Sequence, residues 1–180
     1  MTDDQAQERS FARIPAQSPT DVLDLLPPYP IVLVTTRGNV ITVNQVAYFT
    51  FRPLRIGVAI AHVRYTYGLL SAEGEFVVNV PGISLIEVVK LCGSRSGREG
   101  NKFEAARLTP TPSSQVQAVS IAECGAQIEC RVDRRIEFEH RDWFVGEVVA
   151  ARKREGHMGT EALTCGRNHY LLPGEPVAAR

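Results

Sequence analysis

Runs of β-branched and other apolar residues alternate with short turn sequences along the first half of the chain. The runs 31–36 and 40–44 are separated by Arg37-Gly38-Asn39, and a Gly-Asn step between two such runs is typical of a hairpin. Two further strands are predicted at 54–61 and 75–80. Because 54–61 is almost entirely apolar, we expect it to be central.

Short helices are expected between these strands. The segment 65–74 has Thr66 near its start and Gly74 just beyond its end. The segment 84–93 places apolar side chains at helical spacings behind Ser84, the predicted N-cap. A polar, glycine-rich loop then leads into a helical turn around 101–106.

The second half is predicted to be mostly strand. Segments 126–139 and 143–153 form a long antiparallel pair, with Gly146 as a bulge, and 164–172 forms a last short strand. The proline-punctuated stretch 108–118 is expected to be an exposed connection. Strands that follow one another through short turns favour a barrel or sandwich. Strands and long helices do not alternate, which disfavours a doubly wound parallel sheet.

Composition narrows the class of protein. The chain has 180 residues, 44% of them apolar, as expected for one globular domain. Twenty acidic and twenty basic residues cancel, which argues against a broad nucleic-acid-binding face. No apolar run reaches the roughly 18 residues of a membrane span, and the polar N-terminus lacks a secretion signal. Four cysteines are too few for a disulfide framework, so reduced thiols in the cytoplasm are expected.

No motif of a nucleophilic, zinc-dependent or P-loop enzyme is present. Cys124 and Cys130 lie six residues apart and Cys165 lies four before His169, whereas structural zinc sites have closer cysteine pairs. We therefore predict no metal site, and the residues alone indicate no catalytic side chain.

Three segments suit a phosphate-bearing ligand. Arg64-Tyr65-Thr66 lies at a predicted helix start, where free amides and the helix dipole favour an anion. The loop 90–107 carries five basic and two acidic residues, a local net charge of +3. The segment 42–50 offers Asn and Gln amides that match the polar edge of a flat heterocycle. Each segment also fits a plain structural role: a helix cap, a solvated loop and a strand end.

In order and spacing, these pieces resemble the flavin-reductase-like family of FMN-binding split barrels, which includes flavoredoxin. The resemblance covers about residues 27–172. The matching stretches are YPIVLVTT, ITVNQVAYFTFRPLRIGVAIAHVRYTYGLL, GEFVVNVP, LCGSRSGREGNKFEAARLTP, IAECGAQIECRV and FVGEVVAA.

The resemblance implies a mainly β fold, a six-stranded antiparallel Greek-key split barrel with short helices. Its domain organisation would be an N-terminal arm with a short helix (1–26), the FMN-binding domain (27–172) and a C-terminal tail (173–180). The long arm, and the arginines of the stretch 51–55, depart from the family's usual pattern. The protein would work as a homodimer, with FMN in a groove near the interface.

Site residues are carried over by position. The flavin ring would be bordered by Asn44, Gln45, Val46, Ala47, Tyr48 and Thr50. Arg64 and Thr66 would hold the phosphate, and Asn79 would close the groove. The ribityl-phosphate tail or ring edge would be reached by Ser94, Ser96 and Lys102, with Phe103 completing a Lys-Phe pair. His169, with Tyr170, would approach the flavin from the partner chain.

The function implied is that of an NAD(P)H-dependent flavin reductase with FMN, or FAD in its place, and NAD(P)H as co-substrate. A monooxygenase or an electron-transfer protein would then receive the electrons. Two alternatives stay open: a flavoredoxin-like electron carrier reduced by a protein partner, and a flavin-binding protein without catalysis.

Overall fold

Apolar runs and short turns produce an antiparallel sheet that closes on itself. The computed structural model describes residues 22–23, 25–157, 162–165 and 170–171. Its strands are β1 (Tyr29–Pro30), β2 (Val32–Thr35), β3 (Val40–Val43), β4 (Val46–Phe51), β5 (Leu54–Ala61), β6 (Glu75–Val80), β7 (Pro110–Thr111), β8 (Ser120–Ile121), β9 (Ala126–Glu137), β10 (Arg141–Lys153), β11 (Thr164–Cys165) and β12 (Tyr170–Leu171). Its helices are α2 (Tyr65–Glu73), α3 (Ile86–Ser94), α4 (Lys102–Ala105) and the 3₁₀ turn η1 (Ile83–Leu85).

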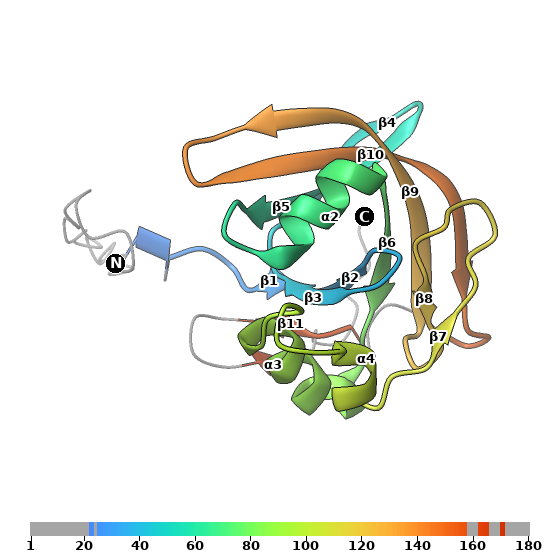
Figure 1. Cartoon of the computed structure of the whole chain (residues 1–180). Coiled ribbons are helices and arrows are strands. Elements are labelled where there is room, and N and C mark those ends of the chain that lie inside the picture. Colours follow the sequence, from blue (N-terminus) through green and yellow to red (C-terminus); the bar gives the residue numbers. More distant parts are fainter. Residues whose placement is uncertain (1–21, 24, 158–161, 166–169, 172–180) are drawn as a thin grey trace, which may run out of the picture.

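The main sheet has seven antiparallel strands in the order β3-β2-β6-β9-β10-β5-β4. The long β9–β10 hairpin curves around one side, and α3 and α4 lie together beside β2 and β3 (Figure 1). The end strands β3 and β4 follow each other directly in the chain, and the Gln45 carbonyl between them accepts a 2.9 Å hydrogen bond from the Ala59 amide of β5. The mainly β barrel prediction is confirmed, with seven strands in place of six.

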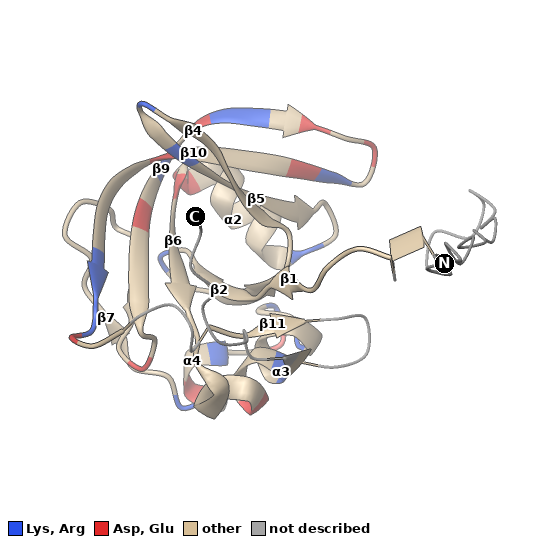
Figure 2. Ribbon diagram, turned by 180° about the vertical axis from the view of Figure 1, so that it is seen from behind, with Lys and Arg blue, Asp and Glu red and all other residues tan. Residues whose placement is uncertain are grey.

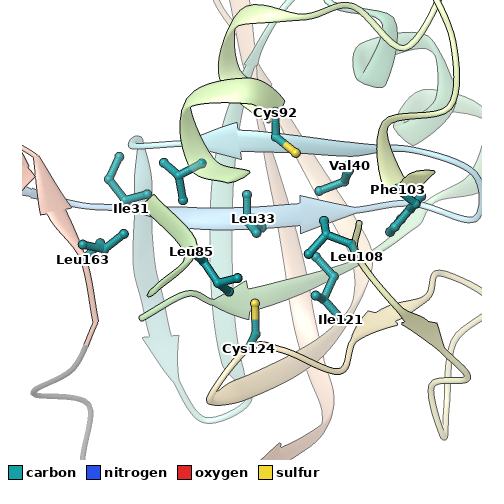
Figure 3. Packing of buried hydrophobic residues seen from close by; sticks show 11 residues of the cluster. Ile31, Leu33, Val40, Leu85, Cys92, Phe103, Leu108, Ile121, Cys124 and Leu163 are labelled. Carbon is teal, nitrogen blue, oxygen red and sulfur yellow. The ribbon is translucent and has the colours of Figure 1, made fainter. Parts of the chain in front are cut away.

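The central strands are buried on both faces, which explains their continuous apolar runs. All four residues of β2 are buried. Val32 and Val34 face the barrel interior with Phe76 and Phe144, whereas Leu33 faces the layer formed by α3. Figure 3 shows that second core, where side chains of α3, α4 and β2 interdigitate. The α3–α4 layer is thereby fixed against the barrel wall.

Two predicted turn features are confirmed. Gly74 ends α2 in the left-handed conformation, with φ 66°, and its amide bonds the Leu70 carbonyl. The register between β9 and β10 shifts at Val145/Gly146, as expected of a bulge. A Cβ on Gly146 would lie 2.9 Å from Cys130 and Phe76, so close packing requires glycine there.

Four local predictions were wrong. The segment 42–50 contains a separate strand, β4, whose exposed side chains gave no core pattern. Instead of one last strand, Thr164–Cys165 and Tyr170–Leu171 form two short strands, β11 and β12, that join β1 in a small sheet. Leu85, not Ser84, precedes α3, because η1 winds the chain one turn earlier. The connection 108–118 is partly buried, since Val116 and Ala118 pack on the barrel.

Candidate anion-binding site

A cavity of about 360 Å³ opens between the β2–β3 hairpin, the start of α2 and the loop after α3. Its lining residues come from three separate stretches of sequence: Asn39 and Ile41; Val63, Arg64, Tyr65 and Thr66; and Arg95, Ser96, Gly97, Arg98, Glu99 and Lys102. Two of the three predicted phosphate segments therefore meet at one place.

The first turn of α2 forms one wall of the cavity. Arg64 is the N-cap residue and its side chain makes no capping hydrogen bond. The first amides of a helix have no partner within the helix, and the dipole makes this end positive. Thr66 is 1% exposed, and its hydroxyl accepts a 2.7 Å hydrogen bond from the amide of Asn39, which is 2% exposed. The Thr66 hydroxyl keeps its own hydrogen for a ligand.

Lys102 forms the opposite wall. It is 4% exposed, and its ammonium donates to the carbonyls of Cys92 at 3.0 Å and Arg95 at 3.3 Å. Burial lowers the pKa of Lys102, and this is the largest effect. Cys92 raises that pKa, by less than burial lowers it, and the charge of Arg64 lowers it further. Two cations are thus close enough to repel each other, and an anion between them would relieve that repulsion.

The cavity carries a net positive charge. Arg64, Arg95, Arg98 and Lys102 face a single acidic residue, Glu99. Across the described residues, none of these four cations forms a salt bridge. This local excess contrasts with the mixed basic and acidic residues seen on the ribbon as a whole (Figure 2). Unpaired cations around a concave site favour a phosphate.

The loop 95–99 is held close to the rest of the cavity wall. Arg98 donates to the Val63 carbonyl at 3.2 Å, and its guanidinium lies 5.5 Å from the centre of the Tyr65 ring. A Cβ on Gly97 would lie 2.4 Å from Oδ1 of Asn39 and 2.6 Å from the Tyr65 ring. Only glycine permits this approach without displacing either side chain.

A buried carboxylate, that of Asp142, stabilises the turn that precedes Arg64. Asp142, with a side chain 2% exposed, accepts hydrogen bonds of 2.8 Å from Nε2 of His62 and from the Tyr67 hydroxyl. Burial raises the pKa of Asp142, but hydrogen bonds from His62, Tyr67 and the Phe138 amide outweigh burial and leave it below its usual value. The hydrogen bond that the Tyr67 hydroxyl donates to Asp142, together with burial, raises the pKa of Tyr67.

The predicted site residues within the described part of the chain fall into three groups. Arg64, Thr66, Ser96 and Lys102 line the cavity. The ring-bordering segment does not: Asn44 is exposed at the far end of β3, with its amide 4.0 Å from Sγ of Cys165, and the Gln45 side chain accepts a hydrogen bond from Arg141. Val46, Ala47, Tyr48 and Thr50 belong to β4.

Other predicted residues are used within the protein. The Asn79 amide donates to Leu33 and Thr35, and its oxygen accepts from the Ile121 amide at 2.8 Å. Phe103 packs in the core of Figure 3. The Ser94 hydroxyl donates to the Lys90 carbonyl at 2.9 Å. His169 lies outside the described residues.

Sequence reasoning missed Asn39 and Ile41 as cavity residues. Asn39 was interpreted only as part of the hairpin turn, and no local signal says that this turn contacts α2. Arg95 and Arg98 were noted as basic loop residues, but the sequence did not show which loop cations face inward. Lys90, from the same loop prediction, instead pairs with Glu87 at 2.7 Å.

Comparison with known proteins identifies the family. The model of the flavin reductase like domain matches residues 26–171, and the chain belongs to this family. An uncharacterized protein of Archaeoglobus fulgidus is 43% identical over 121 residues, which cover 67% of this chain and 68% of that protein.

Solved structures show the same fold. A flavoredoxin from Methanosarcina acetivorans matches with a TM-score of 0.82 and 22% identity, covering 95% of both chains. An FMN-binding protein from Thermus thermophilus, with bound p-hydroxybenzaldehyde, matches with a TM-score of 0.80 and 24% identity, covering 96% of this chain and 98% of that one. The split-barrel prediction is confirmed by these matches. Within the described part of the chain, no helix has the length and apolar character needed to cross a membrane.

Proposed function

We propose that this protein binds FMN, with its phosphate in the cationic cavity, and acts as an NAD(P)H-dependent flavin reductase. The observation that carries the proposal is the convergence of Arg64, Thr66 and Lys102 on one cavity in which no cation is neutralised by a carboxylate of the described chain. Membership of the flavin reductase-like family supports the choice of a flavin over other phosphate ligands.

The residues present suit the flavin phosphate. Arg64 and Arg98 supply planar donors, Lys102 supplies a buried charge, and Thr66 supplies a hydroxyl hydrogen. From this end, β3 leads from Asn39 to Asn44 and Gln45, where side-chain amides are available for the polar edge of the ring. The ring segment and the phosphate cavity therefore lie at opposite ends of one strand.

FMN, when bound, would supply the electron acceptor for hydride chemistry, so the reaction needs no side-chain nucleophile. The protein's part is positioning: Arg64, Thr66 and Lys102 fix the phosphate, and the barrel edge fixes the ring. Holding two rings in contact accounts for catalysis in this proposal. Four unpaired thiols among the described residues fit a reducing compartment, and we place the reaction in the cytoplasm.

We further propose that the protein is a homodimer with FMN near its interface. Strand β4 is an edge of the main sheet and exposes Tyr48 (66%), Phe49 (40%) and Phe51 (74%), with Leu54 beside them (39%). An apolar patch on an unpaired edge strand favours association. Since β4 contains most of the ring-bordering segment, a second copy seated there would reach the flavin.

The experiment is anaerobic mixing of the FMN-loaded protein with NADH and, separately, NADPH, followed at the oxidised-flavin absorption band. Bleaching by either nicotinamide supports the reductase. Bound FMN that is reduced by dithionite but by neither nicotinamide contradicts it, and favours an electron carrier that a protein partner reduces.

A second experiment tests the dimer. Phe51→Asp should lower the molecular mass in sedimentation to that of a monomer, and Phe51→Leu is the apolar control. An unchanged mass of the Phe51→Asp variant contradicts this interface.

A further inference from the structure

A separate cavity lies where β10 ends, between that strand, β7 and the turn after β8. It measures about 330 Å³, and its lining includes Ala122, Gln127, Arg152, Lys153 and Arg154. None of its lining residues lines the cavity to which we assign the FMN phosphate. Figure 2 shows the basic end of β10 next to β7. We call this space the β10 cavity.

The β10 cavity is lined by three cations and by no carboxylate. Arg152, Lys153 and Arg154 follow one another along the chain and all three line the space. Burial raises the pKa of Cys124, a further lining residue, to about 12, so its thiol is neutral near pH 7. Among the described residues, no salt bridge includes any of the three cations. Three positive charges thus meet here without an ion-pair partner.

Neutral oxygen atoms hold the two arginines in place. Arg152 donates from Nε to Oε1 of Gln127 at 3.0 Å and from Nη2 to Oγ1 of Thr111 at 3.2 Å. Arg154 donates from Nη2 to the carbonyl of Ala122 at 3.2 Å. A guanidinium has five N–H donors, so these bonds fix both groups and leave donors for a ligand. Their charge is not neutralised, because every one of these acceptors is uncharged.

Two carboxylates act on this region, but both are bound by backbone amides. Burial raises the pKa of Glu129, but hydrogen bonds from Ser114 and Gln115 outweigh burial, and the charge of Arg152 adds to the lowering. Glu123 accepts hydrogen bonds of 3.1 and 3.2 Å from the backbone amide that precedes β7. Neither carboxylate forms an ion pair with a cation of the β10 cavity.

We infer that the β10 cavity is a second anion-binding site, which takes a small phosphate-bearing molecule independently of flavin. A guanidinium can form two parallel hydrogen bonds to a phosphate, and two fixed arginines suit its several oxygens. The volume is at the low end of the roughly 300–1,000 Å³ of ligand pockets, which favours a small molecule. The chain has no basic excess as a whole, so the three cations form a local site and not part of a nucleic-acid-binding face.

The test is calorimetric titration of the full chain with inorganic phosphate at about 0.15 M salt, where attraction to exposed charges is screened. Without flavin, the wild-type protein should bind two phosphates, one in each cavity. Saturating FMN should displace one of them. The other should remain, with a dissociation constant below about 1 mM.

A substitution that fills the β10 cavity keeps its three cations. Ala122 is exposed and lines the space, so Ala122→Trp should abolish phosphate binding by the FMN-loaded protein. It should change FMN affinity less than about twofold, which also shows that the variant is folded. Ala151→Trp, at an exposed position of β10 that lines neither cavity, is the matched control and should change neither affinity.

A charge substitution gives a second readout. Arg154→Gln should weaken phosphate binding by the FMN-loaded protein about tenfold or more, because a charge-assisted hydrogen bond is lost. Arg134→Gln removes an exposed arginine of β9 that lines neither cavity, and should leave phosphate affinity unchanged.

The outcomes separate this inference from the proposed function. If the FMN-loaded wild-type protein binds no phosphate, or if Ala122→Trp leaves the remaining phosphate bound, the inference is wrong and the proposed function stands. Equal loss of phosphate in Ala151→Trp would also contradict it. If FMN does not bind, the proposed function fails, and the inference stands when Ala122→Trp still removes one of two phosphates.

Discussion

The side-chain amide of Asn39 donates a 2.7 Å hydrogen bond to the hydroxyl of Thr66, and both residues are buried. This bond ties the β2–β3 hairpin to the first turn of α2, although 27 positions separate the two residues. It also occupies the acceptor side of the Thr66 hydroxyl, which leaves its hydrogen for an anion. The cavity is thus preorganised by the fold before any ligand binds.

Gly97→Ala should disrupt this arrangement. The added methyl would lie 2.4 Å from Oδ1 of Asn39, so either the loop or the Asn39–Thr66 bond must shift. Overpacking of this kind typically costs about 1–3 kcal/mol. We expect lower stability in urea denaturation and weaker FMN binding by calorimetry. Gly38→Ala, where the added methyl meets nothing within 4 Å, is the control and should change FMN affinity little.

Arg64→Ala should weaken FMN binding. A charge-assisted hydrogen bond to phosphate is worth about 1.5–3 kcal/mol, which corresponds to roughly a 10- to 150-fold change in dissociation constant. Arg134→Ala removes an arginine that is exposed on β9 and outside the cavity, and should leave the constant unchanged. Equal constants for the Arg64 variant and wild type would remove Arg64 from the phosphate site.

The Asp142 carboxylate makes stability depend on pH. Because its folded pKa lies below the ordinary value of 3.8, the ionised group stabilises the fold above that value, and this contribution is lost as the pH falls through the lowered folded pKa. Asp142→Asn should cost about 1–3 kcal/mol at pH 7, since it weakens buried hydrogen bonds to His62 and Tyr67. Urea unfolding at pH 7 and pH 3 checks this. A deficit equally large at pH 3 would contradict the assignment.

Thiol modification tests where the flavin ring lies. Burial raises the pKa of Cys124 and Cys130 to about 12, so these thiols should react slowly with iodoacetamide at pH 8. Burial also raises the pKa of Cys165, with an opposing effect of Asn44, but Cys165 is only half-buried and should react first. If the ring borders Asn44, saturating FMN should slow alkylation of Cys165. Peptide mass spectrometry measures the rate at each cysteine, and an unchanged Cys165 rate would place the ring elsewhere.

The sequence predicts an element well where one local pattern determines it. The doubly buried β2, the left-handed Gly74 and the bulge at Gly146 each follow from residue type and spacing. Strand β4 was missed because it is paired on one edge only and exposes its apolar side chains. Its sequence therefore lacks the alternation of apolar and polar residues that a half-buried strand shows.

The candidate site was predictable in parts. Arg64 and Thr66 follow from the helix start, and Lys102 from the basic loop. Their meeting depends on contacts between distant segments, such as Asn39 with Thr66, which no local pattern encodes. Asn79 shows the converse: a polar residue at a strand end resembles a ligand contact, but its amide and oxygen bind the neighbouring backbone.

The most direct test of the central claim compares FMN with riboflavin, which lacks the phosphate, by equilibrium titration of the wild-type protein. The account predicts that FMN binds at least about tenfold more tightly, because the cationic cavity recognises the phosphate. Equal affinity for the two flavins, or no binding of FMN, would contradict it.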